Sequence, residues 1–145
     1  MLELGAVAQR LVRTICESCR EQYVPEPALL RQAGLIGNEP AKPTATKSRS
    51  KKKTTAAKPA EPEQIYFRGR GCDECYGTGY RGRTGIFEIL DVNEEIRQAI
   101  SERAPEAELR RLAIEQGMQT LAERGRVRVN RGETTVDEFI RVLYQ

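Results

Sequence analysis

Apolar residues recur at spacings of three and four near the start of the chain. The series consists of Leu4, Val7, Leu11 and Ile15. Side chains at these spacings share one face of an α-helix, because the helix has about 3.6 residues per turn. The pattern therefore predicts a helix over residues 2–15. Where its apolar stripe stays partly exposed, we expect aggregation or association with a partner.

Two short runs farther along the chain have the composition of β-strands. Residues 65–67 and 86–90 are rich in isoleucine and aromatic residues, and we expect a strand at each. The glycines between them are typical of tight turns. A turn of helix is expected around residues 28–33, since Pro25 and Pro27 limit where it can begin.

The C-terminal third returns to a helical spacing. Asn93 can cap the first helix of this part. Pro105 suits the first position of the next helix and Gly117 suits its end. Thr135 and Glu138 have the spacing of a capping box ahead of the last helix. The apolar faces of these helices are expected to form a core.

One internal stretch cannot form a core. Residues 36–63 contain no aromatic residue and are dominated by lysine, threonine, alanine and proline. Such a segment buries too little apolar surface to offset the entropy of ordering it, which predicts a disordered linker. The basic cluster at residues 47–53 can meet an anionic surface or nucleic acid, although a solvated linker explains it more simply.

Composition narrows the location and the chemistry. No apolar run approaches the ~20 residues of a membrane span, and the N-terminus lacks the pattern of a signal peptide. We therefore expect a cytoplasmic protein, in which paired cysteines favour metal over disulfide. The chain contains no histidine, so a soft-metal site must be built from cysteine.

The four cysteines form two C-x-x-C pairs, Cys16 with Cys19 and Cys72 with Cys75. Two such pairs indicate zinc, because each turn lets both sulfurs meet one ion and two turns complete a tetrahedron. Four protein ligands leave no position for water, so the zinc is expected to be structural. The alternatives are redox dithiols of the thioredoxin kind, and unligated cysteines packed as small apolar residues.

The neighbours of the cysteines agree with a thiolate site. Five arginines lie close to them in sequence, and we expect these to lower the thiol pKa values: Arg20, Arg68, Arg70, Arg81 and Arg83. Gly77 and Gly79 are expected to let backbone N–H groups approach sulfur.

These patterns predict an α+β fold that is mostly α. Residues 1–35 would hold the N-terminal helix and the first half of a zinc subdomain, and residues 64–92 the second half. The disordered basic linker, residues 36–63, splits the two halves, and residues 93–145 form a C-terminal helical subdomain. The strand over residues 84–90 joins the two subdomains.

Three blocks of the sequence resemble a known family. They are residues 5–19, residues 70–88 (RGCDECYGTGYRGRTGIFE), and residues 117–121 with 132–138. In order and wording they are similar to the C-terminal part of the type II secretion and type IV pilus assembly ATPases. The resemblance covers nearly all of the chain outside residues 36–63.

The resemblance implies a cytosolic hexameric motor at the inner membrane that drives pilin or pseudopilin assembly by ATP hydrolysis. It implies that Cys16, Cys19, Cys72 and Cys75 bind zinc in a subdomain projecting from the motor. The implied partners are inner-membrane platform proteins and other motor subunits, and nucleic acid is not among them.

The chain departs from that family in its nucleotide chemistry. It has no Gly-x-x-x-x-Gly-Lys-Ser/Thr run to cradle phosphates, and no acidic Walker B segment. Gly77, Gly79 and Gly82 match G-x-G-x-x-G but do not lie between a strand and an amphipathic helix, so we reject a dinucleotide site. We therefore expect a fragment or a separately encoded piece of a motor that cannot hydrolyse ATP alone.

Two other classes of protein remain open at this point. Residues 72–79 match the C-x-x-C-x-G-x-G repeat of DnaJ-type chaperones, but only once where four repeats are needed. A zinc-ribbon nucleic-acid binder would use the basic cluster at residues 47–53 and would bind with a steep dependence on salt.

Overall fold

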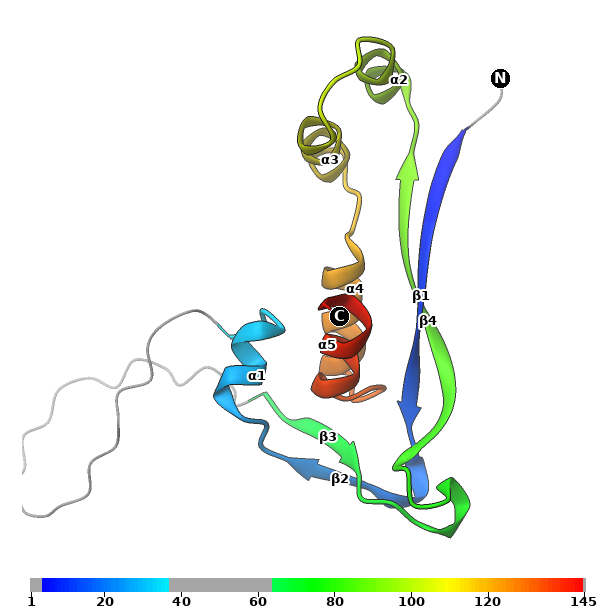
Figure 1. Ribbon diagram of the computed structural model, residues 1–145, viewed down its shortest axis with the longest axis vertical. Helices are drawn as coiled ribbons and strands as arrows, with labels where there is room; N and C mark the ends of the chain where they lie inside the picture. The colour runs from blue at the N-terminus through cyan, green and yellow to red at the C-terminus, as the bar shows by residue number, and fades with distance from the viewer. Residues whose placement is uncertain (1–3, 37–63, 145) are drawn as a thin grey trace, which may run out of the picture.

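The longest feature of the fold is a two-stranded antiparallel ribbon. The computed structural model describes residues 4–36 and 64–144. In it, β1 (Gly5–Ile15) pairs with β4 (Tyr80–Asp91), from Gly5 opposite Asp91 to Arg13 opposite Arg83. Figure 1 shows the two strands running side by side along the length of the molecule.

The helix predicted for residues 2–15 is therefore wrong, since residues 5–15 form a strand. The apolar residues at helical spacing do not share a buried face: Val7 and Leu11 are 63% and 51% exposed. Val12 is fully buried instead, as alternation along a strand requires when one face meets a core. Pairing with β4 outweighs the local spacing, because the strand bonds its backbone to β4 and at the same time buries Val12 and Ile15.

The two faces of the ribbon differ. Directly paired residues of an antiparallel ribbon lie on the same face, and alternate residues lie on opposite faces. Val12 and Ile86 lie on the inner face, against the helices, and both are buried. We call the opposite face the outer face; it carries exposed apolar residues, namely Val7, Leu11, Phe87 and Ile89.

A second, shorter ribbon extends from one end of the first. It consists of β2 (Arg20–Tyr23) and β3 (Tyr66–Gly69), which are antiparallel. Strand β3 confirms the strand predicted at residues 65–67, and β4 contains the one predicted at residues 86–90 but is longer. The expected turn of helix near residue 28 is α1 (Pro27–Gln32).

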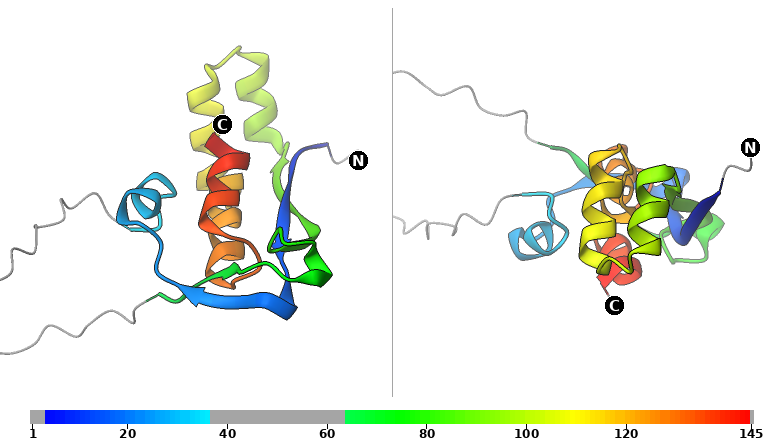
Figure 2. Two further views of the ribbon diagram at one scale, coloured as in Figure 1. Left: turned by 60° about the horizontal axis from the view of Figure 1, so that its bottom comes forward. Right: turned by 90° about the horizontal axis from the view of Figure 1, so that it is seen from above.

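The C-terminal third is helical, as predicted. It forms α2 (Glu94–Ser101), α3 (Glu106–Glu115), α4 (Leu121–Asn130) and α5 (Val136–Tyr144). Figures 1 and 2 show α4 and α5 packed together beside the ribbon, with the α2–α3 pair at its far end. None of the helices in the described ranges is long and apolar enough to cross a membrane.

The helix starts agree only partly with the predicted caps. Asn93 caps α2 as expected, its side chain accepting a hydrogen bond from the Ile96 N–H. Pro105 lies one position before the predicted one, just ahead of the first residue of α3. An unpredicted capping box joins Thr120 and Glu123 at the start of α4.

The main apolar core lies between the short ribbon and helices α1, α4 and α5. Its buried members are Leu30, Ala33, Tyr66, Val129, Val136, Phe139 and Ile140. Gly125 of α4 lies against the Phe139 ring, where a side chain would clash with it. The fold is therefore α+β, with five helices and antiparallel strands in the described ranges. The linker was predicted over residues 36–63, of which residues 37–63 lie outside the described part of the chain, and the four-part division of the chain stays a prediction.

Candidate metal centre

The four cysteines meet where the two ribbons join. Cys16 directly follows β1 and leads into a 3-10 turn, Glu17–Cys19. Cys72 leads in the same way into a second turn, Asp73–Cys75. The Cys16 N–H donates to the Gly79 carbonyl at 3.0 Å, which holds the two turns together. Segments far apart in the sequence thus present two cysteines each to one point.

The sulfur atoms are arranged as the corners of a small cage. All four lie within 4.8 Å of one another, and the four cysteines are free thiols. The Sγ–Sγ distance is 3.8 Å for Cys16 with Cys72, 3.8 Å for Cys19 with Cys75, and 3.6 Å for Cys72 with Cys75. A tetrahedron with Zn–S bonds of about 2.3 Å has edges of about 3.8 Å, so the donor set fits a zinc ion.

The turns that hold these pairs do not match the redox alternative. The first 3-10 turn connects β1 to β2, and the second connects β3 to β4. All four strands pair antiparallel, β1 with β4 and β2 with β3. A thioredoxin-like dithiol instead opens a helix within a βαβ unit. The cage geometry therefore favours a metal over a reactive dithiol.

Backbone N–H groups point at the sulfurs. Gly79 N and Cys72 N each lie 3.2 Å from Cys75 Sγ, and Gly71 N lies 3.3 Å from Cys19 Sγ. The role expected of Gly79 is thus present, whereas the Gly77 N–H donates to the Cys72 carbonyl. The role of Gly71 was missed. It has φ of 96°, and an added Cβ would lie 2.8 Å from the Gly77 carbonyl oxygen, so only glycine suits this position.

Burial and these hydrogen bonds act on the thiols in opposite directions. Burial raises the pKa of the Cys19 thiol to about 12, against the N–H bond from Gly71. Burial also acts on Cys75, but the N–H groups of Cys72 and Gly79 outweigh it and lower the pKa of that thiol to about 6. These backbone N–H groups therefore favour a thiolate on Cys75. A divalent cation would let the other thiols ionise as well.

The arginines were predicted to lower the pKa values of the thiols, but none of them is among the causes that shift the pKa values of Cys19, Cys72 and Cys75. In the described part of the chain, none of them donates a hydrogen bond to a cysteine sulfur. Arg20 lies over the Phe67 ring at 3.9 Å, Arg68 pairs with Glu21 at 2.8 Å, and Arg81 pairs with Glu74 at 2.7 Å. Side chains of this length are drawn to nearby carboxylates and aromatic rings, so the backbone supplies the bonds to sulfur.

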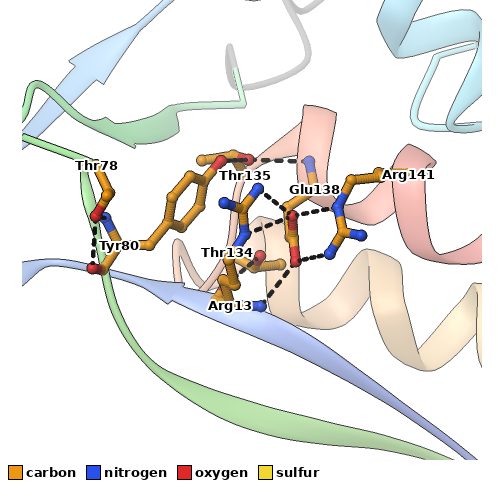
Figure 3. Close-up of polar contacts among 7 residues, drawn as sticks. All are labelled: Arg13, Thr78, Tyr80, Thr134, Thr135, Glu138 and Arg141. Carbon is orange, nitrogen blue, oxygen red and sulfur yellow. Dashed lines mark hydrogen bonds and ion pairs between the residues drawn. The ribbon is translucent and has the colours of Figure 1, made fainter.

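An ion-pair cluster around a buried carboxylate, which we call the Glu138 cluster, lies near the cysteines and was missed. It comprises Arg13, Glu138 and Arg141, and the Glu138 side chain is fully buried. Figure 3 shows the Glu138 carboxylate between the two guanidinium groups. Burial alone would raise the pKa of Glu138, but the hydrogen bonds from Arg141 and Arg13 lower it to about 2.

The predicted capping box at α5 is only half formed because of this cluster. The Glu138 N–H donates to Thr135 Oγ1 at 3.1 Å, as a capping box requires. The Glu138 carboxylate does not return to the Thr135 backbone; it accepts from Arg13 N at 3.0 Å instead. The Thr-x-x-Glu spacing thus predicted the bond from the Glu138 N–H to Thr135 correctly, but not the partner of the Glu138 carboxylate.

The relatives of the chain were found by comparing its sequence with families and curated proteins. Residues 3–141 match the family described as "Type II/IV secretion system protein". The chain is 35% identical over 137 residues to the type IV pilus assembly ATPase PilB of Thermus thermophilus, covering 94% of this chain and 13% of that protein. It is 36% identical over 139 residues to the type II secretion system protein E of Pseudomonas aeruginosa, covering 96% of this chain and 23% of that protein.

A further relative agrees with these two. The type IV pilus assembly ATPase TfpB of Acinetobacter baylyi is 32% identical over 140 residues, which cover 97% of this chain and 20% of that protein. The chain thus spans less than a quarter of the length of these relatives. With a family match across almost all of its length, the chain belongs to the type II/IV secretion system protein family.

Proposed function

We propose that Cys16, Cys19, Cys72 and Cys75 bind one structural Zn²⁺ ion. The observation that carries this proposal is the cage of four sulfurs, which all lie within 4.8 Å of one another and of which three pairs are 3.6 to 3.8 Å apart. Three backbone N–H groups directed at two of the sulfurs support it, since they stabilise thiolates. The ion would cross-link the end of β1 to the glycine-rich segment before β4.

The role of such an ion is mechanical. With four protein ligands it has no open position for water or substrate, so it would not take part in catalysis. Zinc binding contributes about 10–16 kcal/mol in small zinc modules, whereas doubling a flexible loop costs only about 0.6 kcal/mol. A zinc ion can therefore hold the two cysteine pairs together despite the long segment between them.

At the level of the whole protein, the chain would be a zinc-bearing region of a secretion or pilus assembly motor. It would work on the cytoplasmic side of the inner membrane and dock onto other motor subunits and platform proteins. The names of the relatives support the motor, and the exposed apolar residues of the outer face support docking, because such residues mark association surfaces. ATP binding would belong to parts with a P-loop, which this sequence lacks.

Metal analysis of the purified, reduced chain tests the zinc site directly. We expect one tightly held zinc per chain, retained on gel filtration and lost when any one of the four cysteines is replaced by serine. Absence of tightly bound zinc, or a serine variant that keeps the metal, would overturn the site. An ATPase assay on the same material tests the second proposal: we expect no turnover, and turnover by the pure chain would refute it.

A further inference from the structure

The Glu138 cluster occupies a place where the β1–β4 ladder is interrupted. The register of the ribbon shifts between Arg13 and Ile15, which leaves backbone groups there without their regular partners. Three backbone groups of this segment bond to the α4–α5 turn or to α5. The Arg13 N–H donates to Glu138 and the Arg13 carbonyl accepts from Thr134 Oγ1 at 2.8 Å. The Ile15 N–H donates to the Glu133 carbonyl at 3.0 Å.

These contacts lead directly to the first candidate ligand. Cys16 follows Ile15, and its own N–H is held by Gly79. The backbone from Arg13 to Cys16 is thus positioned on one side by the start of α5 and on the other by the second cysteine turn. A displacement of α5 would move the segment that presents the Cys16 sulfur.

A second route joins the other cysteine turn to the same helix. Thr78 Oγ1 donates to the Cys75 carbonyl at 2.6 Å and accepts from the Tyr80 N–H at 3.3 Å. The Tyr80 hydroxyl lies 2.7 Å from Thr135 Oγ1, and the Arg13 guanidinium stacks over the Tyr80 ring at 4.1 Å. Figure 3 shows Thr78, Tyr80 and Thr135 in line toward Glu138.

The Glu138 carboxylate at the centre of the cluster accepts four hydrogen bonds from arginine side chains. Arg13 Nε and Nη2 donate to Glu138 Oε2 at 2.9 and 2.7 Å. Arg141 Nε and Nη2 donate at 2.9 and 2.6 Å. The carboxylate is buried whereas the Arg13 and Arg141 side chains are 43% and 53% exposed, so loss of the arginines would leave a buried charge uncompensated, and the cluster has one strongly preferred arrangement.

We infer that the Glu138 cluster couples metal binding at the four cysteines to the docking of α5 on the ribbon. Metal bound to the cysteines holds the Arg13–Cys16 segment in the geometry that Glu138 and Thr134 bind. Metal binding therefore favours the docked position of α5. By reciprocity, docking of α5 raises the affinity of the cysteines for the metal by the factor by which metal binding favours docking. The coupling rests on the proposed zinc site and extends it. Binding or loss of the metal would change how firmly α5 docks on the ribbon, although α5 supplies no ligand.

Zinc affinity of variants of the full chain tests the coupling. We would replace Glu138 with glutamine, which keeps the size and removes the charge, and measure zinc binding by competition with a chromophoric chelator. The expected loss of affinity is roughly 5- to 150-fold, the usual range of coupling between two sites. The matched control is Glu115→Gln, which breaks the exposed Arg111–Glu115 pair on α3 and should leave zinc affinity unchanged.

Gentler variants keep the test decisive if Glu138→Gln fails to fold. Thr134→Val removes the bond to the Arg13 carbonyl, and Tyr80→Phe removes the bond to Thr135. Each should weaken zinc binding, and the two together should do so more. Unchanged zinc affinity in folded variants would overturn the coupling while leaving the zinc site intact.

Hydrogen exchange of the wild-type chain provides a second readout that needs no variant. We expect amides of α5 to lose protection when zinc is removed by chelation, by a larger factor than amides of α3. Equal exchange of α5 with and without zinc would overturn the coupling. A wild-type chain that holds no zinc at all would instead overturn the proposed site, so the two failures are distinguishable.

Discussion

The two ends of the long ribbon are built on different principles. At the cysteine end, irregular backbone is held by directional contacts, including the bond from Cys16 N to Gly79 O and the ion pairs of Glu138. At the far end the ladder is regular, yet Leu4, Val7 and Ile89 are 57%, 63% and 53% exposed. The comparison teaches that one end is completed by internal polar contacts and the proposed metal, whereas the other exposes apolar surface, where we propose that the chain associates.

The largest effect is expected from loss of a cysteine. Cys75→Ser removes a proposed ligand whose sulfur receives two N–H bonds, and structural zinc contributes about 10–16 kcal/mol in small modules. We expect loss of zinc and of cooperative thermal unfolding, measured by metal content and circular dichroism. The control is Ser18→Ala, which lies between the proposed ligands Cys16 and Cys19 and removes only a surface hydrogen bond to Glu74. If Cys75→Ser unfolds like the wild type, the metal does not organise this end.

The next effect concerns the apolar core that supports the cysteine end. Phe139 is fully buried against α4, so Phe139→Ala should cost about 3–5 kcal/mol in the free energy of unfolding. Phe87 is the matched control, because it is 39% exposed on the outer face and its replacement by alanine should cost about 1 kcal/mol. Urea unfolding measures both. Equal costs would show that the outer face is as well packed as the core.

Acid should weaken the cysteine end through Glu138. Its pKa is about 2 in the folded chain against 4.5 ordinarily, because Arg141 and Arg13 stabilise the carboxylate against burial. A lowered folded pKa contributes stability that is complete above pH 4.5 and is lost as the pH falls toward 2. The unfolding free energy of the wild type should therefore fall more steeply over this window than that of Glu138→Gln. Parallel curves would contradict the role of the carboxylate.

The smallest effect on stability is expected at the outer face. Val7→Thr combined with Ile89→Thr changes exposed residues that are paired across the ribbon, so the free energy of unfolding should change by only about 0.5 kcal/mol. Self-association of the chain should decrease clearly, as measured by sedimentation velocity. Sedimentation of the wild type as a clean monomer would argue against an association surface between copies of this chain.

The sequence predicted the candidate centre better than it predicted the elements around it. The spacing of Cys16 with Cys19 and of Cys72 with Cys75 was enough to predict each pair of sulfurs, because each C-x-x-C turn is a local structure, and the tertiary structure brings the two pairs together as predicted. The role of Gly71 and the failure of the arginines to reach sulfur could not be foreseen, since both depend on how the two turns face each other.

What the sequence alone determined are features with a local cause: the two cysteine turns, the cap at Asn93, and the helices of the C-terminal third. Only the tertiary structure decided that residues 5–15 form a strand, since that choice depends on a partner strand far along the chain. It also decided that the Glu138 carboxylate pairs with Arg13 and Arg141 instead of completing the capping box of α5. Spacing along the chain specifies what a segment can bond with nearby, whereas long-range partners determine which of those bonds it makes.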